Sequence, residues 1–186
     1  MKVYTRAGDD GTTGLFLGGR VSKAAPLMDA CGDIDEAVAA LGVARAAVMA
    51  DPATAEDLGP AILRYQRELF VLAADVATNP THRDRLVPGV SLVTDEMAAD
   101  IEREIDGRVA ARPLRPVFVV PGTTAASAAI DQARAVLRRA ERSIVHLADG
   151  GHPVSPAARR YVNRLSDLLF VLARAAAGEN EPPSHD

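Results

Sequence analysis

The sequence has few of the features that mark secreted or membrane-spanning proteins. Its single cysteine, Cys31, has no partner for an intramolecular disulfide, and the start MKVYTRAGDD lacks the basic and then apolar run of a secretory signal. The apolar run at 168–173 is bounded by Asp167 and Arg174, so no uncharged stretch approaches the roughly 20 residues that span a bilayer. These absences predict a cytoplasmic protein without membrane contact.

Lysine is scarce as well. Only Lys2 and Lys23 accompany the arginines among the 21 basic residues, and 25 acidic residues give a net charge of -4. Such a charge repels nucleic acid, so no nucleic-acid partner is expected. An anion would have to be bound locally by arginines, whose planar guanidinium can donate two parallel hydrogen bonds to a phosphate or carboxylate.

Helical periodicity dominates what is present. With 186 residues and 48% hydrophobic content, the chain can form one domain with its own core. Apolar residues recur at spacings of three and four in five segments, which predicts an all-α, up-and-down five-helix bundle over residues 1–178. Residues 1–25 are expected to form a flexible glycine-rich arm, 117–120 an extended lead-in, and 179–186 a disordered tail. The five segments are 34–48, 58–76, 95–109, 130–147 and 156–176.

Two segments could hold an anion. The arm segment TRAGDDGTTG at 5–14 combines glycines, hydroxyls and one cation, which suits a phosphate chain, although a disordered surface arm is the commoner use of such a segment. Arg134, Arg138 and Arg142 share one helical stripe, with Arg139 and Glu141 beside it. The stripe is either a solvated charged face, which is the commoner case, or an anion site, and the expected burial of this helix weakens the first interpretation.

Several polar groups are open to two interpretations. Asn163 and Asp167, one helical turn apart, could contact a ligand or form a structural network with the preceding helix. Asp35 could serve its helix terminus or pair with an arginine, and Phe118, next to a Pro-Gly turn, could be core or site. No Glu-x-x-His pair accompanies the four histidines, so no protein-bound metal centre is expected.

Three segments together resemble the PduO-type ATP:cob(I)alamin adenosyltransferases. They are YTRAGDDGTTG at 4–14, ARAVLRRAERSIV at 133–145 and NRLSDLLFVLAR at 163–174. CGDIDEAVAALG at 31–42 and FVVPG at 118–122 are similar to two further family segments, so the resemblance covers nearly the whole chain. It implies a five-helix bundle that assembles as a homotrimer with active sites between subunits.

The resemblance also implies roles for individual residues. Asp35 and Arg134 match a pair that meets across the subunit interface, and Phe118 matches an aromatic that displaces the lower base of cobalamin. Arg138 matches an arginine that acts on the triphosphate in the reaction. The residues that match the ATP site are Thr5, Arg6, Ala7, Gly8, Thr13, Gly14, Lys23, Arg138, Arg139, Glu141, Arg142 and Asn163.

The activity implied is transfer of the 5′-deoxyadenosyl group of ATP to the cobalt of cob(I)alamin, with loss of triphosphate. The cobalt is the nucleophile, so positioning and charge stabilisation by arginines and ATP-bound Mg²⁺ would carry catalysis. An external reductant for cob(II)alamin is implied, together with an acceptor enzyme that uses adenosylcobalamin.

Some positions depart from the family pattern, which leaves a non-catalytic cobalamin carrier of the same fold as the alternative. The departures are Ala24, Ala25, Leu27, Cys31, Thr123 and Asp131.

Overall fold

The computed structural model describes Tyr4 and residues 6–185, and its helical bundle confirms the predicted fold class. The described part of the chain holds five α-helices, one short 3-10 helix and one two-stranded hairpin. None of its helices has the length and apolar content to cross a membrane. The elements are β1 (Thr12–Gly14), β2 (Arg20–Ser22), α1 (Pro26–Met49), α2 (Pro52–Val76), the 3-10 helix η1 (Pro80–Arg85), α3 (Asp95–Ala111), α4 (Ala125–Asp149) and α5 (Pro156–Ala177).

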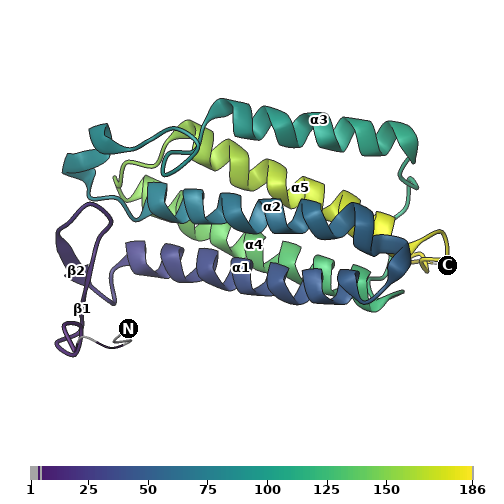
Figure 1. The fold of residues 1–186 in the computed structure, drawn as a ribbon, viewed down its shortest axis with the longest axis horizontal. Helices are drawn as coiled ribbons and strands as arrows, with labels where there is room; N and C mark the ends of the chain where they lie inside the picture. Colours follow the sequence, from purple (N-terminus) through teal and green to yellow (C-terminus); the bar gives the residue numbers. More distant parts are fainter. Residues whose placement is uncertain (1–3, 5, 186) are drawn as a thin grey trace.

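The helices are packed side by side along the long axis of the molecule (Figure 1). α1 packs against α2 and α4, α4 packs against α5, and α3 lies on the outer side of α5. The hairpin and η1 lie at one end of the bundle, whereas the C-terminus lies at the other end. The N-terminal hairpin and the C-terminal segment therefore contribute to different regions of the bundle surface.

The apolar seam of α4 is buried as predicted. Its members Ile130, Leu137 and Ile144 are 0% exposed and join the central core, together with the predicted seams of α2 and α5. Thr124 caps the helix, because its hydroxyl accepts from Ser127 N at 3.0 Å, and Gly150 follows its end. This rigid helix has one face in the core, and its other faces are free to carry the arginines.

α1 begins earlier than the sequence predicted. The helix starts at Pro26 rather than after Asp33, so the acidic residues that were expected at its N-terminus lie inside the helix. Proline fits the first helical turn, and small alanines such as Ala30 continue the buried face, which an aliphatic pattern does not reveal. Leu27, one of the departures from the family pattern, is 6% exposed and belongs to the core.

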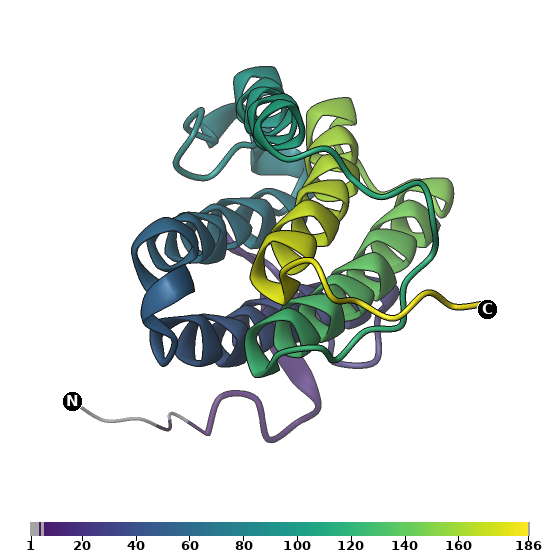
Figure 2. The same cartoon turned by 90° about the vertical axis from the view of Figure 1, so that its right-hand side faces the viewer.

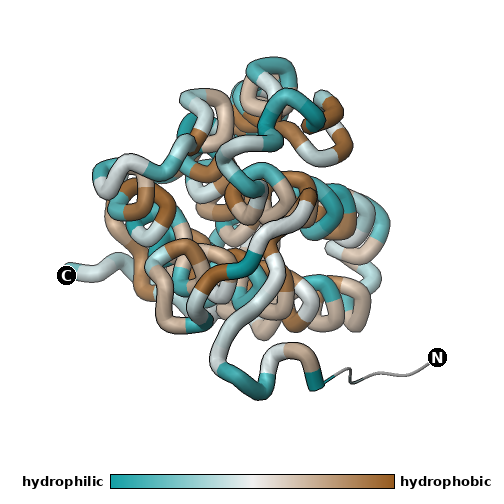
Figure 3. The backbone as a smooth tube through the Cα atoms, turned by 90° about the vertical axis from the view of Figure 1, so that its left-hand side faces the viewer, coloured by the Kyte–Doolittle hydropathy of each residue, from teal (hydrophilic) through white to brown (hydrophobic). Residues whose placement is uncertain are grey.

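The N-terminal arm contains regular structure that the sequence did not predict. β1 pairs antiparallel with β2, and Gly18 and Gly19 turn the chain between them with positive φ angles of 97° and 89°. Asn79 holds this turn to the end of α2, because its Nδ2 donates to Gly18 O at 3.0 Å. Figure 3 looks onto this end of the molecule, where the arm leaves the bundle toward the N-terminus. The prediction of an arm without structure is therefore wrong for residues 12–22.

The C-terminal tail, which the sequence predicted to be disordered, is hydrogen-bonded to the rest of the chain. Residues 181–184 run beside 118–120 at the far end of the bundle, where Val120 N donates to Pro182 O at 2.9 Å and Ser184 N donates to Phe118 O at 2.8 Å (Figure 2). Backbone pairing of this kind depends little on side chains, which is why the polar, proline-bearing sequence did not indicate it.

His152 makes the stability of the fold dependent on pH. Burial lowers the pKa of its imidazole, although Nε2 lies 3.0 Å from Val76 O and this hydrogen bond opposes the shift. The unfolded chain thus binds a proton more readily than the folded chain, so stability falls as the pH drops through about 6.5. We expect His152→Gln to reduce the loss of thermal stability between about pH 7.5 and about pH 5.5.

The control for this experiment is His146→Gln, because His146 is exposed. Thermal melts at both pH values should show the smaller acid-induced decrease only for the His152 variant. Identical decreases in the two variants and the unsubstituted protein would contradict this role of His152.

Candidate active site

An open pocket of about 460 Å³ lies between the second half of α4 and the first half of α5. It is called the arginine pocket below. Arg138 and Arg142 supply its positive charge, and Asn163 reaches it from α5. Its lining residues are Arg138, Glu141, Arg142, Val145, His146, Asp149 and Asn163.

The two arginines of this pocket are available to an anion. Both are exposed, and among the described residues neither forms a salt bridge with a carboxylate. Arg142 Nη1 donates to Arg138 O at 3.0 Å, and the other N–H groups of the Arg142 guanidinium remain available to a ligand. Two guanidiniums one turn apart repel each other, so a polyanion such as a triphosphate would relieve the repulsion.

Glu141 and Asn163 form one side of the arginine pocket as a pair. Asn163 Nδ2 donates to Glu141 Oε1 at 2.8 Å, and Asn163 Oδ1 accepts from Arg164 Nη1 at 2.8 Å. These hydrogen bonds connect α5 with α4, so Asn163 takes part in a structural network, one of the two alternatives that the sequence allowed. The pair also faces the pocket. The pair can therefore orient polar groups of a ligand without moving.

Arg139 does not share the pocket with its neighbours. Its Nε donates to Asp33 Oδ1 at 2.9 Å, and its guanidinium also pairs with Glu36, so it joins α4 to α1. Together with Arg142 it borders a smaller pocket of about 210 Å³ at the start of α1. In the single chain, Arg139 is thus occupied by carboxylates, unlike Arg138.

The predicted arm residues lie at the same end of the bundle as the arginine pocket. Lys23 Nζ donates to Gly8 O at 2.8 Å, and Thr13 and Gly14 belong to β1. Ala7 O accepts from Arg20, and Arg6 lies 5.7 Å from the Tyr4 ring centroid. Thr5 lies outside the described residues.

A third pocket connects the arm with α4. It measures about 520 Å³, and its walls include Leu15 and Val21 from the arm and His146 and Asp149 from α4. His146 and Asp149 also line the arginine pocket, so the two pockets are adjacent. The arm therefore lies next to the arginine pocket.

A further pocket of about 460 Å³ lies beside Phe118 and is called the Phe118 pocket below. Phe118 is 85% exposed, and Val117 and Val120 on the same segment are 45% and 46% exposed, so apolar groups gather on this surface and a ligand or partner could cover them. The lining residues are Ile105, Val109, Leu114, Phe118, Val119, Pro121, Asp131, Arg134, Asp167, Phe170, Val171 and Arg174. Apolar walls with a few charged groups suit a large, partly polar organic ligand.

Arg134 in this pocket lacks a partner for part of its guanidinium. Its Nε is buried and makes no hydrogen bond, while the guanidinium carbon lies 5.4 Å from the Phe170 ring centroid. A buried donor without an acceptor costs about 1–3 kcal/mol, so a partner from a ligand or a second subunit would stabilise it. Asp35 is exposed on α1, and the described residues show no salt bridge between it and Arg134. The single chain does not bring this predicted pair together.

α4 lines both the arginine pocket and the Phe118 pocket. Arg134 borders the Phe118 pocket and Arg138 borders the arginine pocket, and a separation of four residues places them roughly 6 Å apart along the axis of α4. On α5, Asp167 borders the Phe118 pocket and Asn163 borders the arginine pocket, again four residues apart. Ligands in the two pockets would therefore be direct neighbours.

Some lining residues were not predicted from the sequence. His146 continues the spacing of four after Arg142, so the stripe itself could have indicated it. Phe170 lies on α5 among other apolar residues, so the sequence did not distinguish it from the core. Asp149 lies at the end of α4, where no periodic spacing indicates a site residue. Within the described residues, no group of three or more His, Cys, Asp or Glu side chains could hold a metal ion.

Comparison with known proteins shows the family. The model of the cobalamin adenosyltransferase family matches residues 3–176. A cobalamin adenosyltransferase of Cupriavidus metallidurans is 37% identical over 173 residues, which are 93% of this chain and 86% of that protein. A corrinoid adenosyltransferase of Mycobacterium bovis is 40% identical over 181 residues, covering 94% and 88% of the two chains.

A solved structure agrees with these relatives. It is a variant of the PduO-type ATP:corrinoid adenosyltransferase from Lactobacillus reuteri complexed with cobalamin and ATP. Its TM-score is 0.88 at 26% identity, and the match covers 100% of both chains. The fold, the sequence match and the paired pockets agree, and the chain belongs to the cobalamin adenosyltransferase family.

Proposed function

We infer that this protein transfers the 5′-deoxyadenosyl group of ATP to the cobalt of cob(I)alamin, which yields adenosylcobalamin and triphosphate. The observation that carries the inference is the placement of the arginine pocket and the Phe118 pocket along α4, where the arginines that border them are one turn apart. One pocket offers free guanidiniums for a polyphosphate, and the other offers apolar walls for a corrin ring. Family membership supplies the chemistry that such a pair of sites can perform.

The reaction needs no protein nucleophile. The electron pair of cobalt(I) forms a bond to the ribose C5′ of ATP, the C5′–O bond breaks, and triphosphate leaves with that bonding pair. Arg138 and Arg142 would stabilise the negative charge that develops on the leaving oxygen, and their help increases as the bond breaks. Glu141 and Asn163 would orient the nucleotide, whereas Arg139 would support the site by fixing α4 to α1.

The arm would complete the ATP site from its own end of the bundle. Arg6, Gly8 and Lys23 can donate to phosphates, provided that Lys23 exchanges Gly8 O for a phosphate oxygen. Mg²⁺ would be brought by the phosphates, since ATP carries it with few protein ligands.

A second subunit would complete the corrin site. Asp35, exposed on α1, and Arg134, with an unsatisfied Nε, are complementary groups on the same chain, so a homotrimer that joins them would satisfy both. Phe118 would occupy the lower face of the corrin, displace the lower base and ease reduction of cob(II)alamin by an external reductant. We further propose that the enzyme works in the cytoplasm, where ATP is available, and supplies an adenosylcobalamin-dependent enzyme.

Purified protein with ATP, Mg²⁺ and chemically reduced cob(I)alamin should form adenosylcobalamin and one triphosphate for each corrinoid consumed. Absorption spectra follow the corrinoid, and chromatography identifies triphosphate. Tight corrinoid binding without ATP-dependent product would instead identify a carrier. Two of the departures that suggested a carrier have structural roles, because Leu27 lies in the core and Asp131 pairs with Arg174.

A further inference from the structure

The C-terminal segment 179–185 lies beside the extended segment that carries Phe118. Val119 and Pro183 form an antiparallel bridge, and the hydrogen bonds of Val120 N and Ser184 N flank it on both sides (Figure 2). The second of these bonds ends on the carbonyl of Phe118 itself. The backbone of Phe118 is therefore held by the tail while its side chain faces outward.

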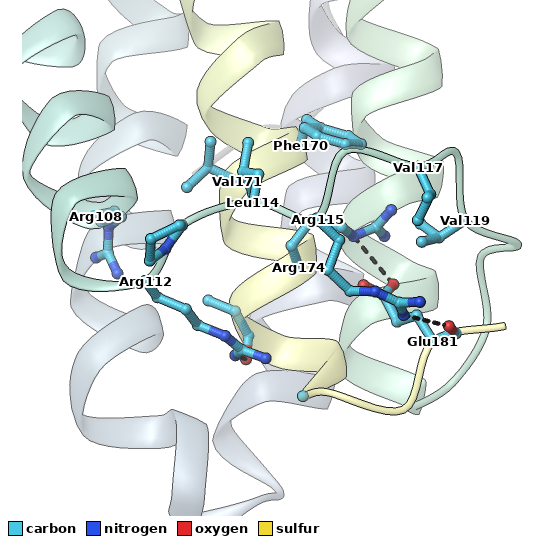
Figure 4. Close-up of a pocket in the computed structure, with 13 residues that line it drawn as sticks. Arg108, Arg112, Leu114, Arg115, Val117, Val119, Phe170, Val171, Arg174 and Glu181 are labelled. Carbon is cyan, nitrogen blue, oxygen red and sulfur yellow. Dashed lines mark hydrogen bonds and ion pairs between the residues drawn. The ribbon is translucent and has the colours of Figure 1, made fainter. Parts of the chain in front are cut away.

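Glu181 is the buried residue of this otherwise exposed segment. Its side chain enters a small cavity of about 60 Å³ beneath residues 112–119 (Figure 4), and the residue is only 6% exposed. Glu181 Oε1 lies 3.1 Å from Arg174 Nε, which is an ion pair without hydrogen-bond geometry, and Arg115 Nη1 donates to the main-chain carbonyl of Glu181 at 2.7 Å. Burial raises the pKa of the Glu181 carboxyl, and the charge of Arg174 opposes this shift.

Arg174 connects Glu181 with the Phe118 pocket. Its guanidinium pairs with Asp131 on α4 and lies 5.0 Å from the centroid of Phe170, an aromatic wall of that pocket. Asp131 and Arg174 themselves line the pocket. The docked tail is thus joined through two ion pairs to the helix that carries Arg134.

We propose that Glu181 is a positioning residue for the corrin site, because it docks the C-terminal segment against residues 118–120 and so fixes the backbone from which Phe118 projects. This inference rests on the proposed function and extends it to a segment outside the helical bundle. Glu181 touches no substrate and acts through Phe118. Loss of its charge would weaken the docking of the segment, since a neutral amide cannot form the ion pair with Arg174 and only the hydrogen bonds to the main chain of the segment would remain.

The test compares Glu181→Gln with the matched control Glu179→Gln, because Glu179 is exposed in the same segment. Each variant is assayed from cob(II)alamin with an added reductant and from pre-reduced cob(I)alamin. We expect Glu181→Gln to slow the cob(II)alamin route about tenfold, as modest misplacement of a site group does, and the cob(I)alamin route less than about twofold. The control should match the unsubstituted protein on both routes.

A double variant separates positioning from a general loss of stability. If Glu181 acts through Phe118, adding Glu181→Gln to Phe118→Ala should cause no further loss on the cob(II)alamin route. Hydrogen exchange of the Val120 and Ser184 amides should also increase in Glu181→Gln. Equal losses on the two routes, or additive losses in the double variant, would overturn the proposal.

A truncation after Gly178 provides the second variant in case the glutamine substitution unfolds the protein, since Arg174 then keeps Asp131 as its partner. The same route-selective loss is expected, and full activity of the truncated protein from cob(II)alamin would overturn the proposal. Absence of activity in the unsubstituted protein would refute the proposed function instead, while the exchange experiment would still test the docking of the segment.

Discussion

Replacing Arg138 by alanine is expected to lower the rate of adenosyl transfer about a hundredfold, the usual cost of removing one donor to a developing negative charge. The fold should be unaffected, because Arg138 is exposed and forms no salt bridge with a carboxylate among the described residues. Single-turnover rates from cob(I)alamin at saturating ATP measure the chemical step, and thermal melts measure the fold.

The matched control is Arg67→Ala, an exposed arginine on α2 that borders none of the pockets described above. It removes the same charge from the molecule, so a long-range electrostatic effect would appear in both variants. Arg138→Lys should give an intermediate rate, because the ammonium keeps the charge and loses the planar fork. An Arg138→Ala variant as active as the Arg67→Ala control would remove Arg138 from the triphosphate site.

Phe118→Ala should separate the two routes to the product. We expect about a hundredfold loss from cob(II)alamin, equivalent to about 2.7 kcal/mol of barrier, and a small loss from cob(I)alamin, which has no lower ligand to displace. The side chain is 85% exposed, so its removal costs the fold little. Rates on both routes, together with the absorption spectrum of bound cob(II)alamin, measure the effect.

Val120→Ala is the control for this prediction, because Val120 is 46% exposed on the same extended segment and borders none of the pockets described above. It should leave both routes unchanged. If Phe118→Ala slowed the two routes equally, displacement of the lower base by this phenyl group would be refuted.

The parts of the fold that follow from side-chain periodicity were predictable. α4 and α5 each alternate buried aliphatics with polar groups at helical spacing, and Thr124 and Ser155 cap them. The start of α1 was missed because alanines carry its buried face there. The arm hairpin and the docked tail depend on backbone hydrogen bonds between distant segments, which leave no periodic signal.

The candidate site was predictable to the extent that it lies on one helix. The spacing of Arg134, Arg138 and Arg142 was visible, but periodicity cannot show that Arg139, one residue further, faces the acids of α1. Nor can it show that Arg134 and Arg138 border different pockets. That division depends on how α5 and residues 112–124 cover α4, which only the tertiary structure reveals.

The relative position of Arg134 and Arg138, which border the two pockets, follows from their place on α4. Because a continuous helix fixes the rise and rotation between its residues, this relation is set within one chain, before a second subunit completes the corrin site. A single residue inserted between Arg134 and Arg138 would turn one group about 100° away from the other. The same insertion would also rotate Ala140 and Ile144 out of the core, so the register of the two pockets is tied to the packing of the whole helix.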